Sequence, residues 1–142
     1  ITPKVTVKYK NITLREGIDY KVVYKSNKKI GTAKIYVIGL NNFKDSNTYK
    51  MKIIPAKTKI TKKKATKKKI TLKLKKVKGA TGYQVVYSLK KNFKGKKKIN
   101  TKKRTVVIKR KKSGKYYVKV RAYKKIGKKY VYGNYTKRIT IK

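Results

Sequence analysis

The sequence of 142 residues contains no cysteine, no histidine and only three acidic residues. The absence of cysteine excludes disulfides, thiolate nucleophiles and cysteine-ligated zinc. Without histidine, general acid–base catalysis near neutral pH would need a carboxylate, a perturbed lysine or a tyrosine. The carboxylates, Glu16, Asp19 and Asp45, are also too few for an oxygen-rich calcium cage. We therefore expect no enzyme, no cofactor and no metal site.

Long apolar runs are absent as well. No stretch approaches the about 20 residues that span a bilayer, and the first residues alternate apolar and polar where a signal peptide would be continuously apolar. Because the chain does not begin with Met, we expect a processed segment whose targeting signal and neighbouring domains lie outside this sequence.

Positive charge dominates what the sequence does contain. It has 47 Lys and Arg residues and a formal net charge of +44. Up to Lys57 there are 13 basic and three acidic residues, whereas the rest of the chain has 34 basic residues and no acidic one. Repulsion at this density destabilises a compact state unless salt or a polyanion screens it. The composition predicts an anionic environment or partner.

The remaining composition favours β-strands. Thirteen Tyr residues, many Val, Ile and Thr, and nine Gly against two Pro are typical of strands joined by turns. In the first third of the chain, short runs alternate apolar and polar residues between turn-forming Gly, Asn and Ser. These runs are Val5–Tyr9, Asp19–Tyr24, Ala33–Val37 and Tyr49–Ile53. They predict one small antiparallel sandwich.

Pro55 marks the predicted boundary, because proline cannot donate to a central strand ladder and the charge density rises just after it. The expected fold is all-β, with two tandem antiparallel β-sandwich modules over residues 1–57 and 58–142. Seven strands are expected in the second module, over 58–63, 69–75, 82–88, 96–101, 104–109, 115–123 and 130–141. The lysine runs 62–64 and 67–69 are interpreted as turns.

The predicted core of the second module follows from strand alternation. Ile70, Leu72 and Leu74 share one face of their strand, and the intervening residues are polar. The residues expected in this core are Leu72, Leu74, Tyr83, Val85, Val118 and Val120.

Both modules resemble known bacterial families. The first carries Leu14–Tyr20, Gly31-Thr32-Ala33, Gly39, Asn42-Phe43 and an apolar strand running into Pro55, and it resembles the immunoglobulin-like repeats of Firmicute surface proteins. The second carries Lys76–Tyr83, Lys115–Tyr123 and Val131–Tyr135, and it resembles lysine-rich clostridial fibronectin type III domains. Leu74 and Tyr135 stand where such domains often have tryptophan.

The resemblance has consequences for one residue and for the location. Tyr116 matches the tyrosine-corner position, which implies a phenol hydrogen-bonded to nearby backbone. Both families serve as spacers, stalks and binding modules, which implies an extracellular or cell-surface bacterial location. A fold hosts many activities, so the family alone does not define the function.

Two short segments allow three chemical alternatives to an ordinary turn. Glu16 and Asp19 could form a carboxylate pair or assist a lysine amide cross-link, but they flank Gly17 and offset local positive charge. Gly79–Gly82 lacks the Lys-Ser/Thr ending and the following helix of a phosphate-binding loop. We interpret all of them as turn residues.

The most informative group interleaves cations with aromatics on one strand. Tyr117, Lys119, Arg121 and Tyr123 have the parity opposite to the predicted core residues Val118 and Val120. They are predicted to form an outer stripe that binds a polyanion through charge and stacking. The alternative is a solvated face on which the tyrosines shield lysine stems.

Three functions remain open at this stage. The first is a structural or adhesive envelope module that binds an anionic polymer such as teichoic acid, acidic polysaccharide or glycosaminoglycan. The second is a nucleic-acid-binding protein, which the charge allows although no recognition helix, RNA-binding aromatic motif or zinc spacing is found. The third is a filament subunit that associates with neighbouring modules through its edge strands.

Overall fold

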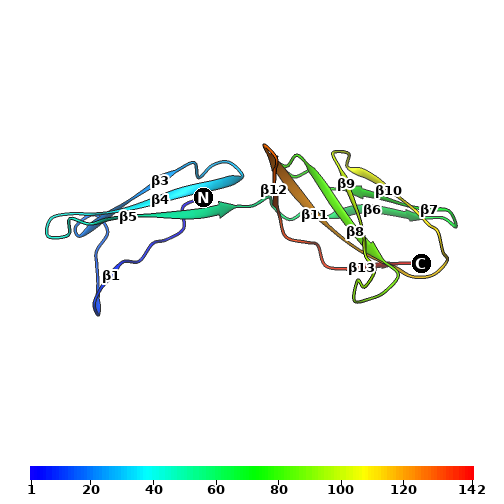
Figure 1. Cartoon of the computed structure of the whole chain (residues 1–142), viewed down its shortest axis with the longest axis horizontal. Coiled ribbons are helices and arrows are strands. Elements are labelled where there is room, and N and C mark those ends of the chain that lie inside the picture. The colour runs from blue at the N-terminus through cyan, green and yellow to red at the C-terminus, as the bar shows by residue number, and fades with distance from the viewer. The chain divides into compact units, whose positions relative to one another are not determined.

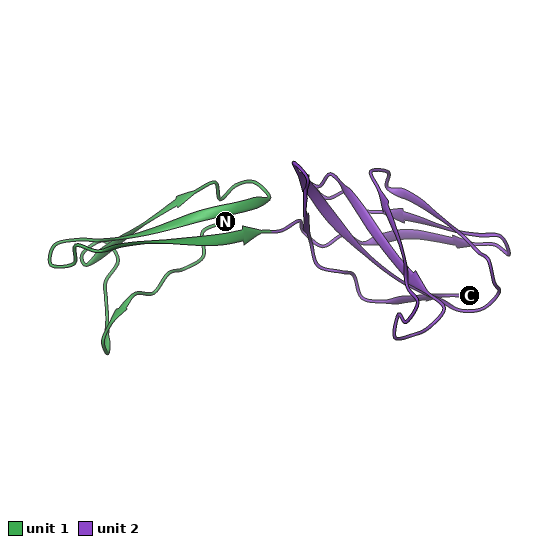
Figure 2. Cartoon of the chain, viewed as in Figure 1, with its two compact units in different colours: residues 1–53 green, residues 54–142 purple.

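The computed structural model describes residues 1–142. These residues form antiparallel β-sheets joined by turns, and they contain no helix (Figure 1). The all-β prediction is confirmed. The chain divides into two compact units, residues 1–53 and 54–142 (Figure 2). No helix long and apolar enough to cross a membrane is present.

Unit 1 contains one three-stranded sheet and a short hairpin. Strands β3 (Tyr20–Lys25), β4 (Gly31–Gly39) and β5 (Ser46–Ile53) are antiparallel in the order β3-β4-β5. Strands β1 (Lys8–Tyr9) and β2 (Ile12–Thr13) form the hairpin. The buried cluster contains Tyr20, Ile35 and Val37, and partly buried Val5, Val7 and Leu14 pack against it.

The predicted strand Val5–Tyr9 is wrong over most of its length, since only Lys8 and Tyr9 belong to a strand. Val5 and Val7 still face the core. The Tyr20 hydroxyl donates to the Val5 carbonyl at 3.1 Å and the Tyr24 hydroxyl to the Pro3 carbonyl at 2.6 Å, and a single backbone bond, Leu14 N to Val7 O at 2.9 Å, joins the segment to the end of the hairpin. The segment is therefore extended without being part of the sheet.

The boundary between the units differs from the prediction by a few residues. We placed it at Lys57, whereas the compact units divide between Ile53 and Ile54. Pro55 is buried, and a Cβ added to Gly133 would lie 2.4 Å from the Pro55 carbonyl oxygen. Because glycine has no Cβ, the backbone at Gly133 can lie this close to the Pro55 carbonyl. Pro55 therefore packs with unit 2.

Unit 2 is a sandwich of two antiparallel sheets. The first has the order β10-β7-β6, made of Thr105–Lys109, Lys69–Leu74 and Ile60–Ala65. The second has the order β12-β11-β8-β9, made of Lys129–Tyr132, Tyr116–Ile126, Gly82–Ser88 and Lys97–Thr101. Strand β13 (Ile139–Ile141) also pairs with β11.

The core of unit 2 contains apolar side chains from both sheets. All six residues predicted for it are buried in one cluster, with Leu72, Val85, Val118 and Val120 at 0% exposure. Ile70, Ile108, Val106 and Ala122 complete the contact between the sheets. The period-two alternation thus identified the inner faces of β7, β8 and β11 correctly.

Two local predictions in unit 2 are wrong. The expected strand 130–141 is divided, because residues 133–138 follow β11 with isolated bonds only, including Gly133 N to Ala122 O at 2.9 Å and Thr136 N to Val120 O at 2.8 Å. The run Lys62–Lys64 is not a turn but lies in β6, whose pairing with β7 is interrupted after Ile60. Exposed lysines on an edge strand discourage pairing with another chain.

Of two further features expected from the sequence, one is confirmed and one is confirmed in part. The Tyr116 hydroxyl donates to the Lys112 carbonyl at 3.1 Å, as the tyrosine-corner position implies. Of the predicted turn residues 79–82, Gly79 lies in a turn with Lys78, closed by Ala80 N donating to Val77 O, and has φ +78°, whereas Gly82 already belongs to β8.

Candidate polyanion-binding surface

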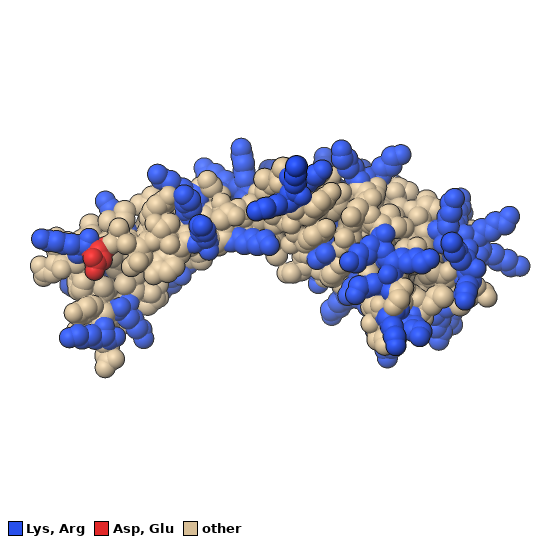
Figure 3. Space-filling model, viewed as in Figure 1, with Lys and Arg blue, Asp and Glu red and all other residues tan.

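Lysine and arginine side chains project from both units, whereas carboxylates are visible at one place on unit 1 only (Figure 3). Glu16, Asp19 and Asp45 all belong to unit 1. The single ion pair of the chain joins Arg15 Nε to Asp19 Oδ2 at 3.5 Å. The cations of unit 2 therefore have no carboxylate side chain in their own unit to pair with.

Asp19, in the turn at Gly17, has local partners. The Arg15 backbone N–H donates to Asp19 Oδ2 at 2.8 Å, and Gly17 N donates to Tyr20 O at 2.7 Å. Gly17 has φ +88°, which favours glycine. These contacts agree with the interpretation of Asp19 as a turn residue.

The predicted stripe lies on the outer face of the five-stranded sheet. Tyr117, Lys119 and Arg121 alternate with fully buried Val118 and Val120, so the predicted parity is confirmed. The three outer residues are half-buried. The fourth member, Tyr123, departs from the expectation of an open stripe because it is only 5% exposed.

Aromatic rings from elsewhere in unit 2 surround the two central cations. Lys119 Nζ lies 4.5 Å from the ring centroid of Phe93 and 4.6 Å from that of Tyr135. The Arg121 guanidinium carbon lies 3.7 Å from the Tyr132 centroid and 4.4 Å from the Tyr135 centroid. Tyr135 thus contacts both cations, and such contacts are attractive through the ring quadrupole.

A buried glutamine connects the cations to the sheet. Gln84, on β8, is 3% exposed. Its Oε1 accepts hydrogen bonds from Arg121 Nε and from the Tyr135 hydroxyl, both at 2.9 Å, and its Nε2 donates to Asn100 Oδ1 at 3.0 Å. The network holds Arg121 in one orientation, since a planar guanidinium is fixed by directional bonds. We call Gln84, Phe93, Lys119, Arg121, Tyr132 and Tyr135 the aromatic–cation array.

Tyr123 has a supporting position next to this array. Its ring centroid lies 5.2 Å from that of Tyr130 and 6.1 Å from that of Tyr132, in edge-to-face contacts. Burial raises the pKa of the Tyr123 phenol above its ordinary value of 10.0, and neighbouring Tyr130 and Tyr132 raise it further. Tyr123 is buried against Tyr130 and Tyr132, so it does not present a free hydroxyl to a ligand.

Sequence reasoning found the two members of the array on β11, Lys119 and Arg121, and missed Gln84, Phe93, Tyr132 and Tyr135. Tyr132 lies on β12, which pairs with β11, so a hairpin prediction ending at Gly133 would have placed it near the stripe. Tyr135 follows β12 without belonging to a strand, and Phe93 lies in the turn between β8 and β9. No local pattern brings Phe93 to Lys119, because this contact depends on the path of a turn.

The array keeps two positive charges at fixed positions on a sheet face. Their charged groups lie against aromatic rings, and this ordering lowers the entropy lost when an anion binds. Lysine ammonium and arginine guanidinium groups donate hydrogen bonds and accept none, so the array suits carboxylate, sulfate or phosphate groups.

No protein-family model matches this sequence, and a search of curated proteins found no similar one.

Proposed function

We propose that the chain is a non-catalytic structural or adhesive module of a bacterial cell-surface or secreted protein, and that its basic surface binds an anionic polymer. Teichoic acid, acidic polysaccharide and glycosaminoglycan have the required chemistry. The proposal combines the family resemblance of the two modules with the charge of unit 2. Two small all-β units in tandem are also compatible with a spacer.

One observation carries the proposal: the residues after Lys57 include 34 Lys and Arg and no acidic residue. Nothing in unit 2 offsets this charge, since the ion pair Arg15–Asp19 lies in unit 1. A bound polyanion would relieve the repulsion and would release its own condensed counterions. Both effects favour association with a polymer over association with a single anion.

Nucleic acid is the main competing polyanion. The sheets of unit 2 provide aromatic rings, but those of the array contact cations of the protein and are half-buried. Stacking on single-stranded bases needs accessible ring faces. A matrix polymer needs only the charges, so we favour it.

The test uses the full chain, with thermal unfolding and titration against heparin, purified teichoic acid and single-stranded DNA of matched charge. We expect the melting temperature to rise with sodium chloride and further with heparin, because both screen the repulsion. The affinity for heparin should fall steeply with salt. A melting temperature indifferent to salt and heparin would refute the proposal, and clear preference for DNA would favour the competing function.

A matched pair of variants locates the binding. Lys119→Gln with Arg121→Gln removes the two array charges, and Lys62→Gln with Lys64→Gln removes two exposed charges from β6. A much larger loss of heparin affinity in the first pair assigns the site to the array. Equal losses assign binding to the basic coat as a whole.

A further inference from the structure

A groove lies at one edge of the unit 2 sandwich, and no residue of the array lines it. Strand β9 pairs with β8 alone and β10 pairs with β7 alone, so each is an edge of its sheet. The groove is lined from both of these strands and from the loops that follow β8 and β10. Its volume is about 640 Å³, within the usual range for a ligand site.

The floor of the groove is apolar. Tyr87 and Tyr116 stack with centroids 6.3 Å apart and planes 28° apart, and Ile99 lies on β9 beside them. Leu89 and Val107 line the same groove and are 43% and 47% exposed. Apolar side chains exposed next to one another mark a binding surface more often than isolated ones do.

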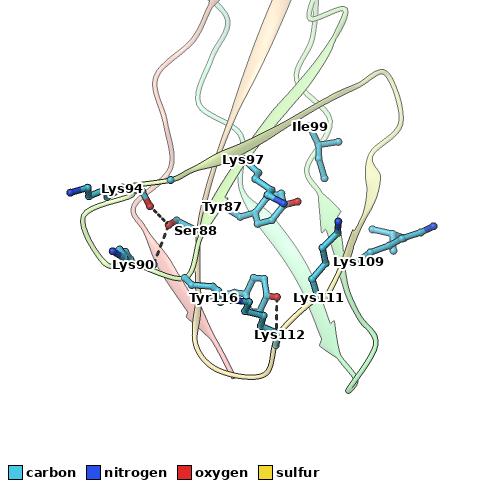
Figure 4. A pocket seen from close by; sticks show the side chains of 13 residues that line it. Tyr87, Ser88, Lys90, Lys94, Lys97, Ile99, Lys109, Lys111, Lys112 and Tyr116 are labelled. Atoms are coloured by element: carbon cyan, nitrogen blue, oxygen red, sulfur yellow. Dashed lines mark hydrogen bonds between the residues drawn. The ribbon is translucent and has the colours of Figure 1, made fainter.

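The rim is entirely cationic. Its charged residues are Lys90, Lys94, Lys97, Lys109, Lys111 and Lys112. In Figure 4 the two tyrosines lie between Lys90 and Lys94 on one side and Lys109 and Lys111 on the other. No Asp, Glu, Asn or Gln lines the groove. A ligand must therefore supply negative groups that accept hydrogen bonds, together with an apolar part for the floor.

The loops that carry these lysines are braced by hydrogen bonds. The Ser88 hydroxyl donates to the Lys94 carbonyl at 2.9 Å and accepts from Lys90 N at 3.1 Å. On the opposite side, the Tyr116 hydroxyl donates to the Lys112 carbonyl, and Arg110 donates to the carbonyls of Thr66 and Gly114, each at 3.1 Å. A preformed groove loses less entropy on binding than a mobile one.

We infer that this groove binds an extended acidic peptide that presents both carboxylate and apolar side chains on one face, at successive every-second positions. The free edge of β9 offers unpaired backbone N–H and C=O groups, to which an added strand can hydrogen-bond. Lys97 and Ile99, two residues apart, both line the groove, so an added strand would direct alternate side chains the same way. On that face an apolar side chain would cover Ile99, and a carboxylate two residues away would meet Lys97.

This peptide fits better than a polysaccharide. A sulfated or uronic-acid polymer supplies charge, but it has no apolar side chains for Leu89, Ile99 and Val107. The inference concerns a protein partner and does not depend on whether the basic coat binds a polymer.

The experiment titrates the full chain with a fluorescent peptide long enough to pair with all of β9. On one face of this peptide, at every second position, Asp or Glu alternates with Ile, Val or Leu, and the other face carries Ser or Thr. A second peptide carries serine at the apolar positions and has the same charge. We expect the first peptide to bind at least about tenfold more tightly than the second, because apolar contacts add to charge. Amide NMR signals of residues 97–101 should shift with the first peptide. Equal affinity for the two peptides would overturn the inference.

Variants separate the groove from the general coat. Leu89→Ser with Val107→Thr changes exposed side chains, and it should weaken peptide binding about fivefold or more while leaving heparin binding unchanged. Lys109→Gln with Lys111→Gln should weaken peptide binding more than Lys62→Gln with Lys64→Gln, which lie outside the groove. Equal losses in these two lysine pairs, or an unchanged affinity in the apolar pair, would refute a groove site. If heparin displaces the peptide from the wild type, and Lys109→Gln with Lys111→Gln removes the binding of heparin as well, the groove is instead a polysaccharide site.

Discussion

The guanidinium carbon of Arg121 lies 3.7 Å from the ring centroid of Tyr132, across the pairing of β11 and β12. Arg121 also donates from Nε to Gln84. Arg121, which the sequence predicts as a ligand contact, therefore has a structural role as well. The effects of its replacement on polyanion affinity and on the free energy of unfolding must be measured separately.

Replacing Arg121 with Ala should destabilise the fold by about 1 to 3 kcal/mol, because the contacts with Tyr132 and Tyr135 and the bond to buried Gln84 are lost. Urea unfolding measures the change. Arg104→Ala is the matched control, since Arg104 is exposed and contributes its backbone carbonyl to a bond with Leu74. Similar effects of the two substitutions would show that the array does not stabilise unit 2.

Replacing Tyr116 with Phe should cost about 1 kcal/mol, because it removes the hydroxyl that donates to Lys112 and retains the buried ring. Chemical denaturation at neutral pH is the measurement. Tyr117→Phe makes the same chemical change next to it on a half-buried outer ring and should have a smaller effect. A loss as large at Tyr117 as at Tyr116 would argue against the corner.

Replacing Leu74 with Ala should cost about 2 to 5 kcal/mol, since the side chain is 1% exposed between the sheets and its removal leaves a cavity. Val107→Ala, at an exposed position of the same sheet, should cost much less. Denaturant midpoints of the two variants test the difference. A negligible effect at Leu74 would mean that the strand faces are reversed.

Stability should fall at alkaline pH partly because of Tyr123. Burial raises the pKa of its phenol in the folded chain, so above about pH 10 the unfolded chain releases this proton first and unfolding becomes more favourable. Below that pH the contribution is constant. Melting temperatures of the wild type and Tyr123→Phe should therefore differ by a constant amount near neutral pH, and the wild type should lose more above pH 10. Lysine deprotonation occurs in both proteins and cancels, so parallel curves throughout would contradict the prediction.

Particular residues show how far the sequence predicts this structure. The inner faces carrying Leu72, Val85 and Val120 follow from alternation, because a strand places every second side chain on the same side. The bond from the Tyr116 hydroxyl to the Lys112 carbonyl was expected from the resemblance to fibronectin type III domains, not from alternation. The segment near Val5 was misjudged because its backbone is bound by distant phenols of β3, which no local pattern reveals.

The sequence by itself determined the charge of the molecule, the absence of thiol and imidazole chemistry, the β-strand character and the parity of the stripe, since composition and period-two alternation are local properties. Only the tertiary structure decided that Phe93 and Tyr135 enclose Lys119, that Tyr123 is buried, and that β9 and β10 border a lysine-rimmed groove. These features join residues far apart in the chain. They depend on the paths of turns and on the pairing order of the strands, which are set by the packing of the whole unit.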